Sequence, residues 1–218
     1  MFTIIISAII SPLLAILLFA YMKYRFSGGN FGLLFRSYFW GLFSTVFAAL
    51  ILYIAYLGGY LDLKNLRRIL FYSFFVIGFG QEFGKFLMLR YLMLPSKLFK
   101  NPADGIIYSM MINFGAVTAV NIATLLVTPE YDPTLLISYS LVSIVFAVIM
   151  GFFVGMGKAR NNRLVDSLTG LFGAAFFHGS YEFILETNDH LLFWPFLIGS
   201  AIITFLLVIK AVQLTDED

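Results

Sequence analysis

Residues 133–157 read PTLLISYSLVSIVFAVIMGFFVGMG, a run of 25 residues without a single Asp, Glu, Lys or Arg. A helix needs about 20 predominantly apolar residues to cross the hydrocarbon core of a bilayer. This stretch is long enough, and nothing in it is charged. It therefore predicts a transmembrane helix. The length of each stretch between charged residues can be used in the same way to find further spans in the chain.

Four further stretches of 20 to 25 residues lack charge in the same way: 1–22, 37–61, 105–129 and 190–209. Two more, at about 69–94 and 167–186, are as apolar in composition but contain ionisable residues. The start of the chain lacks the basic segment and the small-residue cleavage site of a signal peptide, so we expect a retained helix there. The sequence thus predicts seven spans in a single integral membrane domain, residues 1–218.

The composition supports this fold class and excludes several functions. Apolar residues make up 61% and charged residues 12% of the chain, and the mean hydropathy is +0.92, whereas soluble domains are roughly 45–50% apolar and about 25% charged. A dispersed net charge of +2 does not favour nucleic acid as a partner. The absence of Cys excludes disulfides, thiolate catalysis and Cys-ligated zinc. We expect an all-α, polytopic transmembrane helical bundle whose surroundings are the lipid bilayer.

The distribution of Lys and Arg predicts the orientation, because basic residues in short loops stay on the cytoplasmic side. With the N-terminus outside, ten of these residues lie on the cytoplasmic side and only three lie outside: Lys64, Arg67 and Arg68. We therefore predict the N-terminus out and the C-terminus in, in a bacterial-type inner (plasma) membrane. The basic first outer loop runs against the rule, and Pro12 predicts a kink in the first helix unless neighbours bond the freed carbonyl.

Four ionisable side chains fall inside the predicted spans: Glu82, Lys85, His178 and Glu182. A charge at mid-membrane costs about 2.5–3.5 kcal/mol on insertion scales, so such residues usually face the bundle interior and serve a function. Glu82 and Lys85 are three residues apart, and His178 and Glu182 are four apart, so each pair shares one helix face. We expect a polar cavity between the third and sixth helices, open toward the outer side, in which Glu82 and His178 activate water.

The same groups permit two other interpretations. Glu82, His178 and Glu182 also provide nitrogen and oxygen ligands for a divalent metal such as zinc. Alternatively they are structural, because buried polar groups hold helices together through hydrogen bonds. The structural interpretation is the better one for three uncharged residues, which are cheaper to bury: Asn113, Asn121 and Ser143.

Two GxxxG pairs indicate close helix contacts: Gly80 with Gly84, and Gly151 with Gly155. Helix association in lipid depends on small residues that let the backbones approach. The first pair lies on the same helix as Glu82, which suggests that this helix is central.

Four blocks in order along the chain form a recognisable set: QEFGK at 81–85, DGIIYS at 104–109, GFFVG at 151–155 followed by GKAR at 157–160, and HGSYE at 178–182. In these blocks the sequence resembles the PrsW family of intramembrane proteases, relatives of the CAAX prenyl endopeptidases. The corresponding family blocks are EExxK, DGxxYG, a GxxxGxA-type block and HGxYD. The resemblance runs from about Arg36 to Ile184, which is most of the chain.

The resemblance implies a polytopic protease that cuts a membrane-anchored regulator, typically an anti-sigma factor, near the outer face of the membrane. Matched position by position, Glu82 would be an essential carboxylate and His178 an essential imidazole. Lys85 would be the charge partner, and Glu182 occupies the position usually held by Asp. The partner would be a membrane-anchored protein or a single transmembrane helix.

Several positions depart from the family pattern. Gln81 replaces the first Glu of EExxK, and Ser143 occupies the position of a family His. In the FxxxEN block, Ala116 replaces Phe and Val120 replaces Glu, so that only Asn121 of the EN pair remains. Valine can neither ligate a metal nor transfer a proton, and serine is a poor zinc ligand. At two positions in these blocks, Gln81 and Asn121, we expect contacts with the substrate.

The sequence leaves it open whether the chain is an enzyme. One function is a PrsW-like protease in which Glu82 and His178 activate water directly or through a metal. Lys85 would then hold Glu82 ionised, and Glu182 would orient His178 or complete the metal site. The alternative is a catalytically inactive pseudoprotease that binds membrane helices as an adaptor or assembly subunit. An ion or proton carrier fits less well, because a relay needs polar groups across the whole span and the inner third of the bundle has none.

Overall fold

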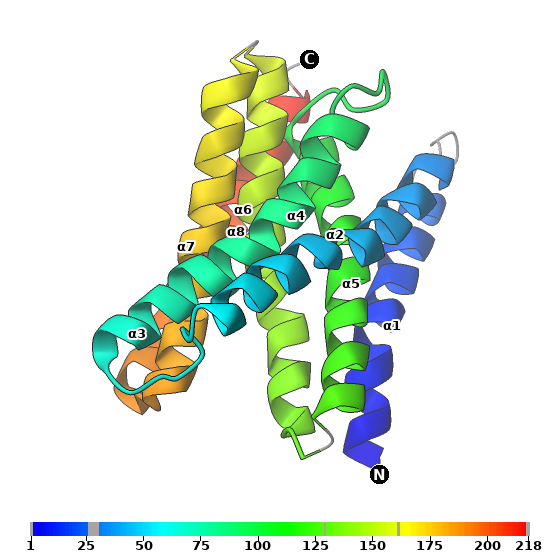
Figure 1. Ribbon diagram of the computed structural model, residues 1–218. Helices are drawn as coiled ribbons and strands as arrows, with labels where there is room; N and C mark the ends of the chain where they lie inside the picture. The colour runs from blue at the N-terminus through cyan, green and yellow to red at the C-terminus, as the bar shows by residue number, and fades with distance from the viewer. Residues whose placement is uncertain (1, 26–30, 129, 161, 217–218) are drawn as a thin grey trace.

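The computed structural model describes residues 2–25, 31–128, 130–160 and 162–216, and these residues fold into seven helical segments without a strand (Figure 1). The segments are α1 (Phe2–Arg25), α2 (Phe31–Leu57), a continuous third segment formed by α3 (Leu66–Phe71), η1 (Tyr72–Phe79), α4 (Gly80–Leu87) and η2 (Met88–Met93), α5 (Pro102–Val127), α6 (Pro133–Ala159), α7 (Arg163–Thr187) and α8 (His190–Asp216). The predicted all-α class and the number of helices are confirmed.

Five helices of the described residues are long and apolar enough to cross a membrane: α1, α2, α5, α6 and α8. They correspond to the five charge-free stretches of the sequence. The other two, the third segment and α7, contain the ionisable residues. An odd number of spans leaves the two termini at opposite ends of the bundle, as Figure 1 shows. Which end faces the cytoplasm stays a prediction. Pro12 lies inside α1, which is helical on both sides of it.

The third segment changes its winding twice, because η1 and η2 are π-helical and flank the α-helical α4. In a π-helix each N–H group bonds the carbonyl five residues earlier, a rare arrangement that is frequent at functional sites. Most of α4 is buried, Glu82 and Lys85 included, and it contacts α2, α5 and α7. The expectation that this helix is central agrees with that burial.

Both predicted GxxxG pairs lie at close helix contacts. A Cβ atom on Gly84 would overlap the carbonyl oxygen of Ser44 in α2. A Cβ atom on Gly151 would come within 2.7 Å of the Cα atom of Ile106 in α5. The absence of a side chain therefore brings α4 against α2, and α6 against α5, at backbone contact.

The helix ends are capped by local side chains. Asn101 accepts a hydrogen bond from the Asp104 N–H group at 3.0 Å, and the Asp104 carboxylate accepts one from the Asn101 N–H group at 3.4 Å, which forms a capping box at the start of α5. Asp132 accepts a hydrogen bond from the Thr134 N–H group at 2.8 Å at the start of α6. Hydrogen bonding by Thr134 holds the pKa of Asp132 below its usual value. α7 ends at Asn188 in the left-handed conformation, with φ of 51°.

Candidate active site

Glu82 of α4 and His178 of α7 lie 96 residues apart in sequence but are in direct contact. Glu82 Oε1 and His178 Nδ1 are 2.8 Å apart. Neither residue has any exposed surface. The structure therefore brings together the two side chains that the sequence singled out, inside the bundle and away from lipid.

A glycine contact between η1 and α7 sets this distance. A Cβ atom on Gly78 would lie 2.7 Å from the Ala175 carbonyl oxygen and 2.8 Å from the Gly179 backbone nitrogen. Gly78 precedes Glu82 by four residues, and Gly179 directly follows His178. Because the two backbones touch at this point, the short reach of a glutamate and an imidazole is enough to close the gap between the helices.

Lys85 extends the pair into a buried network. Its Nζ atom lies 2.5 Å from Glu82 Oε1 and donates a second hydrogen bond to Asn113 Oδ1 at 3.0 Å. The Asn113 amide nitrogen in turn donates to Ser143 Oγ at 2.8 Å. The ammonium group thus compensates the buried negative charge of Glu82, and uncharged groups of α5 and α6 hold the ammonium in place. Asn113 and Ser143 are hydrogen-bonded as expected, but their bonds support the predicted charged pair.

The bond to Glu82 determines which nitrogen of the imidazole is free. An ionised carboxylate only accepts hydrogen bonds, so Nδ1 of His178 is the donor. Nε2 of the neutral ring is then an acceptor. Among the described residues, neither His178 Nε2 nor Glu82 Oε2 has a hydrogen-bond partner, although both atoms are buried. These two atoms are the unpaired acceptors of the Glu82–His178 pair.

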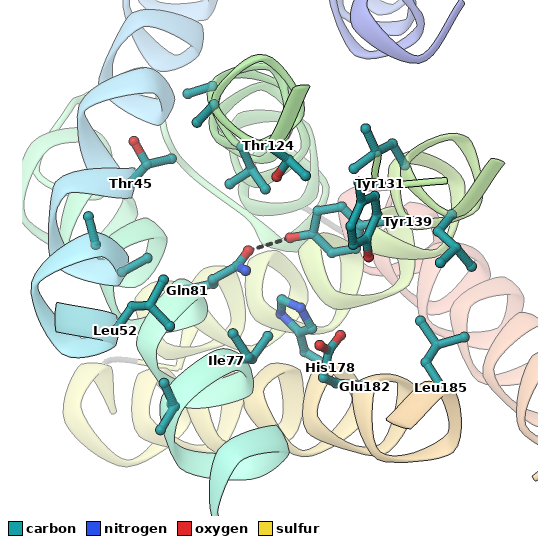
Figure 2. A pocket seen from close by; sticks show the side chains of 18 of the residues that line it. Thr45, Leu52, Ile77, Gln81, Thr124, Tyr131, Tyr139, His178, Glu182 and Leu185 are labelled. Atoms are coloured by element: carbon teal, nitrogen blue, oxygen red, sulfur yellow. Dashed lines mark hydrogen bonds between the residues drawn. The ribbon is translucent and has the colours of Figure 1, made fainter. Parts of the chain in front are cut away.

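Two aromatic rings of α6 hold the imidazole plane. The Phe146 ring stacks on His178 with 4.7 Å between centroids and 13° between planes. The Tyr139 ring lies 5.4 Å away, and its hydroxyl donates to Gln81 Oε1 at 2.5 Å (Figure 2). Since this bond engages the oxygen of the Gln81 amide, the NH₂ group remains free to donate to a ligand. The sequence did not single out either ring, because an aromatic residue in an apolar helix reads as lipid-facing or core.

A cavity of about 440 Å³ borders the pair, well within the range of small-ligand sites. Residues of α2, η1, α4, α5, α6 and α7 line it, and Figure 2 shows Gln81, Tyr139, His178 and Glu182 around it. It extends toward Thr128 and Tyr131, at the connection between α5 and α6. This is the end of the bundle that the charge distribution predicts to lie outside. A cavity therefore lies between the third segment and α7, the predicted third and sixth helices, with additional walls from α2, α5 and α6. Its lining is mostly apolar, whereas the sequence predicted a polar cavity.

Glu182 lies on the wall of this cavity, one helical turn after His178. Among the described residues, no hydrogen bond joins it to His178 or to any other side chain. The orienting bond to His178 Nδ1 comes from Glu82, on a different helix. Glu182 thus lines the cavity without taking part in the Glu82–His178 bond.

Asn121, predicted to contact the substrate, faces away from the cavity lining. Its amide nitrogen donates to the Ser7 carbonyl oxygen at 2.8 Å and to Ser140 Oγ at 3.0 Å. These bonds tie α5 to α1 and α6. The neighbouring Val120, where the family has Glu, lines the cavity instead.

This fold and site define a class of protein: a multi-pass membrane protein with a buried carboxylate–imidazole pair beside an intramembrane cavity. The chain belongs to the PrsW family, whose sequence model, described as "PrsW family intramembrane metalloprotease", matches residues 29–212. The predicted family and the multi-pass membrane location are therefore confirmed.

Several relatives are similar over almost their full length. "Protease PrsW" of Oceanobacillus iheyensis is 30% identical over 200 residues, which cover 89% of each chain. "Protease PrsW" of Bacillus subtilis is 31% identical over 204 residues, again 89% of each chain. "Protease PrsW" of Halalkalibacterium halodurans is 26% identical over 218 residues, 98% of this chain and 97% of the relative. No solved structure gives a significant match.

The family description names a metal, and the donor atoms of this site can be compared with what zinc requires. A catalytic zinc takes three protein ligands from His, Cys, Asp and Glu. In the described part of the chain, no three such side chains lie together. Glu82 Oε2 and His178 Nε2 provide two free donors, and Glu182 does not join them. As they lie among the described residues, Glu82 and His178 provide two of the three ligands that a catalytic zinc takes.

Proposed function

We propose that this chain is an intramembrane protease that hydrolyses a peptide bond in a membrane-anchored regulatory protein, with Glu82 and His178 activating water. The observation that supports this proposal is the 2.8 Å bond from His178 Nδ1 to Glu82 Oε1, which leaves Nε2 free in a residue of the cavity wall. The same division of roles, a carboxylate that orients an imidazole and an imidazole that moves the proton, operates in serine hydrolases.

The steps follow from this arrangement. His178 Nε2 accepts a proton from water as the oxygen attacks the peptide carbonyl carbon, and Glu82 stabilises the imidazolium that forms. Lys85 compensates the charge of Glu82 throughout. The NH₂ group of Gln81 donates to the developing oxyanion, a contribution that is typically about 10²–10³-fold in rate. His178 then returns its proton to the leaving amine, the C–N bond breaks, and the imidazole is neutral again.

The route to the pair is sideways, between α2 and α5. These two helices touch where a Cβ atom on Gly41 would lie 3.0 Å from the Cα atom of Ile112, and α2 runs obliquely across α5 in Figure 1. Beyond this contact both helices line the cavity, with mostly small side chains: Thr45, Ala48 and Ala49 from α2, and Ala119, Val120, Ala123 and Thr124 from α5. A membrane-anchored segment that entered between these helices would reach the cavity wall that contains His178.

The test is a cleavage assay on co-expressed, epitope-tagged single-span membrane proteins. Wild type should release a fragment, and Glu82→Gln and His178→Ala should lose about 10²–10⁴ of the rate, as expected for removal of a general base. Glu186→Gln is the matched control, because Glu186 lies exposed on the same helix as His178, outside the cavity lining. Identical product patterns from wild type and Glu82→Gln would contradict the proposal. If wild type captures candidate proteins without cutting them, and Glu82→Gln and His178→Ala capture them equally well, the result would instead indicate the pseudoprotease.

A further inference from the structure

A second cavity lies at the opposite end of the bundle from the site, between the η2–α5 connection and the junction of α6 with α7. Its volume is about 560 Å³. Four basic side chains and no acidic one line it: Lys97, Lys100, Lys158 and Arg163. The remaining lining residues are Pro95, Phe99 and Ala159. The basic residues come from the connection, from the end of α6 and from the start of α7, so the fold gathers them from separate parts of the sequence.

The walls of this cavity are fixed by hydrogen bonds. Lys158 Nζ donates to the carbonyl oxygens of Leu94 and Ser96, both at 2.7 Å, and lies 5.5 Å from the centre of the fully buried Phe99 ring. Arg90 donates to the Arg163 carbonyl oxygen and thereby holds the start of α7. Lys158 therefore has a fixed position in the cavity, whereas Lys97, Lys100 and Arg163 are exposed side chains around its mouth.

The four basic side chains of this cavity exceed the acidic groups near it. In the described part of the chain, no ion pair joins Lys97, Lys100, Lys158 or Arg163 to a carboxylate. Asp104 lies near, but its carboxylate accepts the backbone N–H group of Lys100 at 2.8 Å and serves to cap α5. Cations gathered in a partly enclosed space raise the local potential and attract an anion.

The position of the cavity indicates which anion. It lies where α6 ends and α7 begins, beside exposed apolar side chains such as Leu98 and Leu164, which are 41% and 61% exposed. A ligand at this place meets a basic cavity on one side and apolar surface on the other. If this end faces the cytoplasm, as the charge distribution predicts, retention of basic loops accounts for the Lys and Arg at this end of the bundle, but not for four of them lining one cavity.

We propose that this cavity binds the phosphate head group of an anionic phospholipid, with the acyl chains lying along the apolar surface beside it. Basic pockets of this kind, at the membrane boundary and on the side where Lys and Arg gather, suit anionic head groups. The site is separate from the Glu82–His178 pair, and its occupation does not depend on whether the chain is a protease.

The test measures lipid binding to purified, delipidated protein in detergent. Phosphatidylglycerol and phosphatidylcholine with the same acyl chains are titrated, and bound lipid is counted by native mass spectrometry while the melting temperature is recorded. The variant Lys97→Gln/Lys100→Gln removes two charges whose ammonium groups make no hydrogen bond or ion pair in the described structure. The control, Lys23→Gln/Lys210→Gln, removes two exposed charges near the same end of the bundle, outside the cavity.

We expect phosphatidylglycerol to bind and raise the melting temperature of wild type and of the control. In the cavity variant its affinity should fall roughly 30-fold, from what two basic residues contribute near an anionic lipid. Equal binding of phosphatidylglycerol to the cavity variant and wild type would overturn the proposal, and so would equal stabilisation by phosphatidylcholine. Inorganic phosphate is the third probe, and full stabilisation by it at the lipid concentration used would assign the cavity to a soluble anion and overturn the lipid assignment.

Discussion

Replacing Gly78 by Ala should separate the two residues of the candidate active site without touching either one. The added Cβ atom would lie 2.7 Å from the Ala175 carbonyl oxygen, whereas ordinary contact begins at 3.4 Å. η1 and α7 must therefore move apart by about 0.7 Å, which lengthens the 2.8 Å bond between Glu82 and His178 to about 3.5 Å, the limit beyond which a hydrogen bond is lost. Overpacking of this kind typically costs about 1–3 kcal/mol of stability.

The assay needs no substrate, because the chain contains only two histidines, His178 and His190. In protein labelled with ¹⁵N-histidine, the ring nitrogens report which of them carries the proton, and a hydrogen-bonded Nδ1–H proton resonates far downfield. Wild type should show one imidazole locked with its proton on Nδ1. Gly78→Ala should lose this signal while far-ultraviolet circular dichroism stays helical, and any cleavage activity should fall by about 10²-fold, as a 1 Å misplacement can cause.

The matched control is Gly80→Ala, two residues away on the same continuous helix. A Cβ atom there meets only side-chain carbons of Ile51, at 3.3 Å, which can shift by a few tenths of an ångström. This variant should keep the Nδ1 signal. If Gly78→Ala also keeps it, then the glycine contact does not set the geometry of the Glu82–His178 pair, and the account of how α7 is positioned is wrong.

Three further outcomes follow from the structure. Lys85→Met should destabilise the protein by about 3–5 kcal/mol, because it leaves a buried carboxylate uncompensated. Adding Glu82→Gln to the same chain should recover part of the lost thermal stability. No recovery would show that the unpaired charge of Glu82 is not the cause. Gly151→Ala should lower the melting temperature through a clash with α5, 2.7 Å from a backbone Cα atom, whereas Gly199→Ala, which meets nothing within 4 Å, should not; equal melting temperatures would refute the contact. Elemental analysis should find no equimolar zinc, because no three His, Asp or Glu side chains lie together in the described part of the chain; an equimolar amount that His178→Ala removes would reverse this conclusion.

The sequence identified the two residues of the pair for a physical reason. An ionisable group inside an apolar span is expensive, so Glu82 and His178 stand out in a chain of 61% apolar residues. The same reasoning cannot identify Tyr139 or Phe146, because uncharged aromatic side chains are common in apolar helices and do not stand out there. It also assigned Asn113 only a packing role. The bond of Asn113 to Lys85 joins two helices and two residues that are 28 positions apart in the chain.

Charge-free lengths and apolar composition by themselves determined the membrane environment and the seven helices, and four short motif blocks in order determined the family, because these properties depend on residues that are close in sequence. Tertiary structure decided that Glu82 rather than Glu182 orients His178, that Asn121 faces α1 and α6, and that the cavity is walled by α2 and α5. Spacing along one helix says which residues share a face, but not which face of another helix they meet. Here the contact between Glu82 and His178 depends on the backbone contact at Gly78 and on the π-helical segment before Glu82. Neither feature can be derived from the 3.6-residue period of an α-helix.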